Sequence, residues 1–199
     1  MNNSNPRFIR LAGMCGLVSP LFSLAATLIA VVLVPDFSWQ TNDLSDMGIS
    51  PTPNPFNASL IIAGILSLIF ALGVRQWIGP GRVGRLGSLT LILGSITLSL
   101  IGIVVESIKP WHFNIAVAYF TLVPLSYILL GTAMIRSGRL IAGNLSIAAA
   151  IVAALIMIFR KTLTHDDGIA VPEMLTSMIN NAWAFGLGLT LLLERSKAP

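Results

Sequence analysis

Charged side chains are scarce in this sequence. Only 10% of its 199 residues are Asp, Glu, Lys or Arg, whereas 55% are hydrophobic. A soluble domain carries about 25% charged residues, so a chain of this composition cannot cover a surface that faces water. Most of the surface must face lipid, and the length is that of one helical bundle. We therefore expect a single membrane domain over residues 1–199.

Cysteine and histidine are equally sparse. Cys15 is the single cysteine of the sequence, so no disulfide bond can form between two of its 199 residues. His112 and His165 belong to no HxxxH or HExxH pattern, so a zinc site would need more than one carboxylate ligand as well. The phosphate-binding, dinucleotide-binding and nucleophile-elbow motifs are also missing. The sequence therefore predicts no cofactor and favours no metal site.

Apolar residues, by contrast, form long runs. Six runs approach the length of about 20 residues that a membrane-spanning helix needs, and none alternates in the manner of a barrel strand. Because lipid requires each spanning segment to satisfy its own backbone groups, the runs predict helices. The expected fold class is all-α, a bundle of six transmembrane helices at 11–34, 56–74, 86–105, 113–135, 140–159 and 169–193.

The basic residues predict how this bundle is oriented. They form no run that would indicate a nucleic-acid partner, although the net charge is +4. Cytoplasmic loops of membrane proteins are enriched in Lys and Arg. Only Lys109, Arg160 and Lys161 fall on one side of the six spans. We therefore expect a multi-pass protein of the cell membrane with both termini in the cytoplasm, on the side of Arg7, Arg10, Arg75, Arg82, Arg85, Arg136, Arg139, Arg195 and Lys197.

The longest polar interval, 39–57, separates the first two spans on the expected outer side. It contains Asp43 and Asp46, three prolines and no Lys or Arg. Polar residues also recur at helical spacing inside four spans, so that they share one face of each helix. We expect a polar pocket that opens outward beneath the 39–57 loop. The stripes are Ser19, Ser23 and Thr27; Ser95, Ser99, Gly102 and Glu106; His112 and Tyr119; and Glu173, Ser177 and Asn180.

Some of these polar residues are stronger site candidates than others. Serine and threonine in a membrane helix often bond to their own backbone, whereas an acid within or beside a span is costly and indicates function. Glu106 and His112 stand six residues apart across a short turn, and a carboxylate beside an imidazole suits general acid–base chemistry. The candidate catalytic residues are Glu106, His112, Glu173 and Asp46, and the candidate ligand-binding residues are Asn42, Ser45, Asn57, Ser99, Tyr119, Ser177 and Asn180.

Small residues at a spacing of four predict close contacts between helices. Such residues let two helix backbones approach each other. One set lies in 169–193, at Ala182 and Gly186, and the other in 140–159, at Ala142, Ser146, Ala150 and Ala154. We expect both sets to face neighbouring helices.

Several motifs carry a resemblance to a known family. The most specific is Asn-x-Leu-Ser-Asp-x-Gly at 42–48; the others are Phe37-Ser38-Trp39, Phe56-Asn57, Glu106 with His112, Pro172-Glu173 and Trp183. With them, nearly the whole chain resembles domain-of-unknown-function family 998. In that family the acid before the fourth helix usually follows Phe-Pro, where this chain has Val104-Val105. The resemblance implies a six-helix bundle found in bacteria and archaea, and no established reaction. The layout is more distantly similar to the Frag1/DRAM/Sfk1 group, which is associated with lipid handling.

Three functions are compatible with these observations. The first is binding of a lipid, an isoprenoid-like molecule or another amphipathic ligand in the outward pocket. The second is a membrane-embedded acid–base enzyme acting on a lipid or isoprenoid, with Glu106 or Glu173 as the acid and His112 as the base. The third is a small transporter, which the lack of paired Gly- or Pro-broken helices disfavours. Membrane lipids are the expected partners, and the sequence leaves the ligand and the oligomeric state open.

Overall fold

The computed structural model describes residues 5–163 and 168–196. Within them the chain is helical, with long helices joined by short connections. The predicted all-α class is therefore confirmed. The elements are α1 (Pro6–Leu33), the 3-10 helix η1 (Leu44–Ile49), α2 (Asn54–Trp77), α3 (Arg82–Ile103), α4 (Trp111–Arg136), α5 (Leu140–Ile158), the short α6 (Arg160–Leu163) and α7 (Ala170–Ser196).

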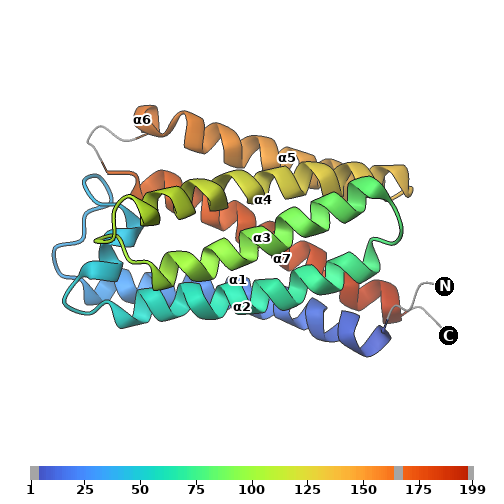
Figure 1. The fold of residues 1–199 in the computed structure, drawn as a ribbon, viewed down its shortest axis with the longest axis horizontal. Helices are drawn as coiled ribbons and strands as arrows, with labels where there is room; N and C mark the ends of the chain where they lie inside the picture. Colours follow the sequence, from blue (N-terminus) through green and yellow to red (C-terminus); the bar gives the residue numbers. More distant parts are fainter. Residues whose placement is uncertain (1–4, 164–167, 197–199) are drawn as a thin grey trace.

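The six long helices form a closed bundle. Helices α1 to α5 pack in chain order, each against the next, and α7 packs between α5 and α1. Figure 1 shows that α1 begins and α7 ends at the same end of the bundle, while η1 lies at the other. We call the first the arginine end, because Arg75, Arg82, Arg136 and Arg139 lie at its two helix connections. The second is the η1 end.

Within the described residues, five helices are long and apolar enough to cross a membrane, namely α1 to α5. The predicted sixth span, 169–193, corresponds to α7, which has 27 residues but is not among these five. This helix carries Glu173, Asn180 and Asn181 along its length. The multi-pass helical architecture is thus confirmed, and a crossing by α7 is part of the proposal below.

The two connections at the arginine end are tight turns, as their glycines predict. Gly79 and Gly138 adopt φ values of 81° and 83°, in the left-handed region that only glycine enters without strain. Each turn therefore reverses the chain within a few residues. As a result, α2 and α3 form one antiparallel pair and α4 and α5 form another.

The prediction for α3 needs a correction. This helix was expected to continue to residue 105 and to carry Glu106 on its polar face, but it ends at Ile103. The residues that follow form a turn before α4. Glu106 therefore lies in a connection whose backbone is not helical, and this turn directs its side chain toward η1 and α4.

The prediction of close helix contacts is half right. Ser146 and Ala150 are buried on α5, as expected. On α7, however, Ala182 is exposed, and a Cβ built at Gly186 would meet nothing within 4 Å. The close approach occurs at Gly188 instead, where an added Cβ would lie 2.9 Å from the Gly13 carbonyl oxygen. The crossing angle of α7 against α1 therefore selects a different face from the one that spacing suggested.

Candidate functional site

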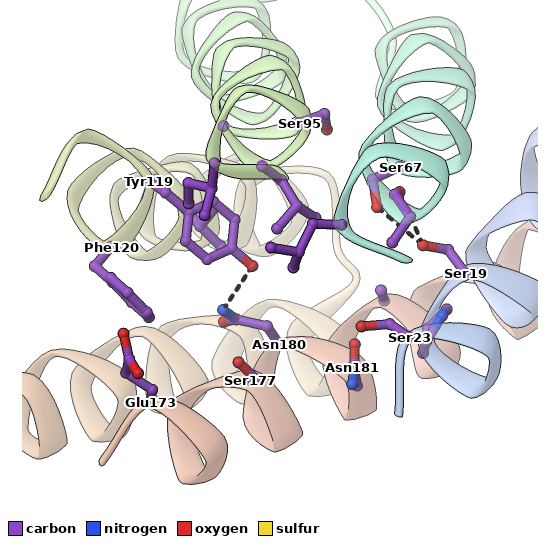
Figure 2. A pocket seen from close by; sticks show the side chains of 18 of the residues that line it. Ser19, Ser23, Ser67, Ser95, Tyr119, Phe120, Glu173, Ser177, Asn180 and Asn181 are labelled. Atoms are coloured by element: carbon purple, nitrogen blue, oxygen red, sulfur yellow. Dashed lines mark hydrogen bonds between the residues drawn. The ribbon is translucent and has the colours of Figure 1, made fainter. Parts of the chain in front are cut away.

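A cavity of about 120 Å³ lies within the bundle, toward the η1 end. Five helices line it, and α5 contributes none of the lining residues. The lining side chains come from α1 (Ser19, Ser23), α2 (Ser67, Phe70), α3 (Ser95), α4 (His112, Tyr119, Phe120) and α7 (Glu173, Ser177, Asn180, Asn181), with Leu44 and Ser45 of η1 at one end. Figure 2 shows many of these side chains pointing into the space between the helices.

An aromatic cluster forms the deep end of the cavity. Trp183 stacks on Tyr127 with ring centroids 4.0 Å apart, and Phe70 meets Trp183 edge to face at 6.1 Å. The indole Nε1–H of Trp183 donates to Ser146 Oγ at 2.8 Å. This bond satisfies the polar group of a buried Trp and ties α7 to α5. The deep end is therefore apolar and well packed.

The middle of the cavity is polar but incompletely bonded. Asn180 Nδ2 donates to the Tyr119 hydroxyl oxygen at 3.4 Å, and Figure 2 shows this contact bridging α7 and α4. Asn180 Oδ1, which is buried, has no hydrogen-bond partner within the described ranges. Across the cavity, Ser19 Oγ donates to the Ala63 carbonyl at 3.0 Å and lies 3.2 Å from Ser67 Oγ. A buried acceptor without a partner costs free energy, so Asn180 offers a contact to a bound molecule.

Helix η1 covers the cavity and is held by two acids. The Leu44 N–H donates to Glu173 Oε2 at 2.7 Å, and the Ser45 hydroxyl donates to Glu106 Oε2 at 3.0 Å. Asn57 Nδ2 also donates to the carbonyl of Gly48 at 2.8 Å. These bonds join η1 to α7, to the α3–α4 turn and to α2. The position of this cover therefore depends on side chains from three distant parts of the chain.

Glu106 and His112 form the ion pair that the sequence suggested. His112 Nε2 lies 3.0 Å from Glu106 Oε2, and the imidazole is almost fully buried. The His112 Nδ1 atom faces the Val104 carbonyl within hydrogen-bonding distance. A carbonyl only accepts, so Nδ1 carries a proton, and a further proton must lie between Nε2 and the carboxylate. The exposed Lys109 ammonium lies 3.4 Å from the other Glu106 oxygen.

Asp43 lies just before η1 and holds the start of α7. Its Oδ1 accepts the Ile169 N–H at 2.9 Å, and the Asn42 carbonyl accepts the Ala170 N–H at the same distance. Burial raises the pKa of the Asp43 carboxyl, and the Ile169 N–H opposes this effect. The neighbouring carboxyls of Asp46 and Glu106 also raise this pKa.

The raised pKa of Asp43 predicts a pH dependence of stability. The folded protein holds this proton to a higher pH than the unfolded chain, so the free energy of unfolding should fall as pH rises above the ordinary pKa of 3.8. Asp43→Asn keeps an oxygen for the Ile169 N–H and loses the charge. We expect this variant to show a smaller fall with pH and to match or exceed wild-type stability at neutral pH.

The measurement is thermal unfolding in detergent from about pH 3.5 to about pH 7, the window of the carboxyl titrations. Asp36→Asn, a substitution at an exposed acid of the same loop, serves as the control and should keep the wild-type pH profile. If Asp43→Asn were less stable than the wild-type protein at every pH, the prediction would be wrong.

The structure brings some of the predicted site residues together and separates others. Ser45, His112, Glu173, Tyr119, Ser177 and Asn180 line the cavity. Asn42 and Asp46 do not, because they line a separate hollow beside η1, where Asn42 Nδ2 donates to Asp46 Oδ2 at 2.9 Å. Asn57 braces η1, and Ser99 donates to the Ile61 carbonyl at 3.2 Å between α3 and α2. Neither Asn57 nor Ser99 lines the cavity, and the ligand-binding role expected of them stays a prediction.

Sequence reasoning also missed contributors to the site. Asp43 was visible as an acid of the 39–57 loop, but nothing in its spacing indicated a bond to Ile169. Phe120 read as an ordinary apolar position and Trp183 stood out only as part of the family resemblance, yet both line the cavity. Within 5–163 and 168–196, no three His, Cys, Asp or Glu side chains are arranged to hold a metal ion. His165 lies outside the described residues.

The comparisons with known proteins agree with the resemblance. A family described as "Protein of unknown function (DUF998)" matches residues 17–190. The chain belongs to this family. The residues that line the cavity run from Ser19 to Ala184, so the whole cavity falls within the DUF998 region. The match also includes Glu106. No curated protein and no solved structure matches the chain.

Proposed function

We propose that this DUF998 protein crosses the membrane six times, with its arginine end in the cytoplasm, and binds an amphipathic molecule in the cavity beneath η1. The amphipathic molecule is a lipid or a molecule of similar build. Its apolar part lies toward Trp183 and Tyr127, and its polar part lies toward Glu173.

The distribution of polarity within the bundle supports this proposal. Aromatic rings close the deep end of the cavity, whereas Glu173 of α7 and Ser45 of η1 lie at the other end. Ligand sites usually combine an apolar lining with a few convergent polar groups. Arg75, Arg82 and other basic residues lie at the opposite end of the bundle, which favours a cytoplasmic arginine end.

The single observation that carries the proposal is the unpartnered oxygen of Asn180. Protein interiors rarely leave a buried polar atom without a partner, and this one lines the cavity. A ligand that donates a hydrogen bond to Asn180 Oδ1 would remove the free-energy cost of leaving this buried oxygen without a partner. The volume of about 120 Å³ is below the roughly 300 Å³ of typical ligand pockets. The cavity therefore takes the polar end and the adjoining apolar segment of an amphipathic molecule and not a whole lipid.

The Glu106–His112 pair favours one alternative, an acid–base enzyme of the membrane. The two side chains lie 3.0 Å apart, and His112 lines the cavity. In this alternative His112 would exchange a proton with the polar end of the substrate. Chemical change of a bound lipid during incubation with the purified protein would support it, and recovery of the unchanged lipid would favour binding alone.

The first test concerns orientation. In a Cys15→Ala background, Thr52→Cys places a thiol at the η1 end and Gly81→Cys places one at the arginine end, both at exposed positions. We expect an impermeant thiol reagent to label the first variant and not the second in intact cells. Permeabilised cells should show both labelled, as a control for reactivity. The reverse pattern in intact cells would move the cavity to the cytoplasmic side.

The second test concerns occupancy of the cavity. Ser177→Phe adds a ring inside the cavity, whereas Ala182→Phe adds the same ring at an exposed position of the same helix. Overfilling a packed space costs about 1–3 kcal/mol, so we expect about a tenfold loss of bound amphipathic molecule in Ser177→Phe. Mass spectrometry of lipid extracts from the purified variants measures it. Equal retention in wild type and both variants would contradict binding in this cavity.

A further inference from the structure

Glu173 is a buried acid without a cation. Its side chain lines the cavity, and the residue is only 9% exposed. One hydrogen bond from the Leu44 N–H satisfies Oε2. Among the described residues no Lys, Arg or His side chain forms an ion pair with it. The charged groups that act on Glu173 are the carboxyls of Asp43, Glu106 and Asp46, all of the same sign.

An ionised carboxylate in such a place needs a counter-charge from elsewhere. Burying a charge is costly unless it is paired, and three neighbouring acids increase the cost. Glu106 faces the Lys109 ammonium and the His112 imidazole, whereas Glu173 faces no such group within the described part of the chain. A cationic group entering the cavity would complete the pairing.

The walls around Glu173 also suit a cation, and an organic one. Phe120 and Tyr119 line the same cavity from α4, and Figure 2 shows the Phe120 ring and the Glu173 carboxyl pointing into the same end of it. An aromatic face attracts ammonium groups. A hydrated metal ion would instead need several oxygen ligands, and among the described residues no three His, Cys, Asp or Glu side chains are arranged to hold one.

We propose that the polar end of the amphipathic ligand is an ammonium group, primary or quaternary, held between Glu173 and the aromatic ring of Phe120. This inference rests on the proposed function and names the class of its ligand. Asn180, seven residues further along α7, lies about 10 Å deeper at 1.5 Å per residue. Its free oxygen accepts a hydrogen bond from the body of the ligand.

The test compares four probes that share one octyl chain. They are octylammonium, octyltrimethylammonium, octanol and octyl sulfate, and equilibrium dialysis against protein in maltoside micelles measures their binding beyond that of micelles alone. We expect at least one ammonium probe to bind about tenfold more tightly than octanol, as an ion pair and a cation–π contact allow. The two ammonium probes show whether a primary amine or a quaternary group is preferred. Octyl sulfate should bind more weakly than octanol.

Three variants assign the preference to its residues. Glu173→Gln should lose most of the ammonium preference and keep only the part that the Phe120 ring supplies. Phe120→Leu keeps an apolar side chain, so it should lower ammonium binding severalfold and leave octanol binding unchanged. This variant decides the test if Glu173→Gln does not fold. Asp36→Asn removes an exposed acid near η1 and should keep the wild-type preference.

The possible failures are distinguishable. Equal binding of octanol and the ammonium probes to the wild-type protein would overturn the cation inference and leave the proposed function standing. An ammonium preference that is undiminished in Glu173→Gln, or equal losses of octanol and ammonium binding in Phe120→Leu, would overturn the assigned contacts. No binding of any probe would overturn the proposed function together with the inference.

Discussion

Replacing Glu106 with alanine is expected to destabilise the protein by about 3 kcal/mol, the lower end of the range for breaking a buried ion pair. The substitution leaves His112 buried with Nε2 unpaired, and it removes the acceptor for the Ser45 hydroxyl. The side chain of Glu106 is 16% exposed, so the loss should not reach the upper end. Helix η1 would lose one of its two acidic contacts and cover the cavity less firmly.

Glu106→Gln and Lys109→Ala serve as matched variants. An amide nitrogen at the position of Oε2 can donate to a neutral His112 and to the Ser45 oxygen, with the amide oxygen facing Lys109, so the cost of Glu106→Gln should stay below about 1.5 kcal/mol. Lys109 has a side chain that is 73% exposed, and losing its contact should cost no more than about 0.5 kcal/mol. Unfolding in detergent, followed by intrinsic fluorescence, gives all three values. Equal small losses in the alanine and glutamine variants would mean that water, and not η1 and His112, satisfies Glu106.

Gly188→Ala is expected to cost about 2 kcal/mol, because overpacking of a tight contact typically costs 1–3 kcal/mol. The added Cβ would lie 2.9 Å from the carbonyl oxygen of Gly13 and 3.1 Å from the Cα of Gly16. Backbone atoms cannot rotate out of the way, so α1 and α7 would have to move apart. Both helices line the cavity, and ligand binding should weaken together with stability.

Gly186→Ala is the control, two residues away on the same helix. Nothing lies within 4 Å of the new methyl group, and alanine is the better helix former by about 1 kcal/mol. This variant should therefore be as stable as wild type or slightly more so. The same unfolding experiment compares the two. If Gly188→Ala were no less stable than Gly186→Ala, α1 and α7 would not be closely packed at Gly188.

Much of the fold could be predicted because the lipid environment leaves few choices. A long apolar run can satisfy its backbone only as a helix or in a barrel, and Gly79 and Gly138 indicate tight reversals. The all-α class, the α2–α3 and α4–α5 pairs and the family followed from such local patterns. Even so, α3 ends before Glu106, since local apolarity does not define where a helix stops.

The contents of the site could be predicted only in part. The pairing of Glu106 with His112 was accessible because both residues flank one short turn. The contact of Glu173 with Leu44 spans 129 residues of sequence, and no periodicity in one segment reports the position of another. Likewise, Ser99 and Ser95 share the polar face of α3, yet only Ser95 lines the cavity.

The sequence by itself determined that this chain is a membrane-type helical protein, where its long helices lie and which acids lie near one end. These properties depend on composition and on spacing within a segment, and neither requires contacts between helices. Only the tertiary structure decided that η1 covers a cavity, that Glu173 faces it without a cation from the described residues, and that α7 packs through Gly188 and not Gly186. The reason is physical: spacing places residues on a helical face, but the crossing of neighbouring helices determines which face is buried.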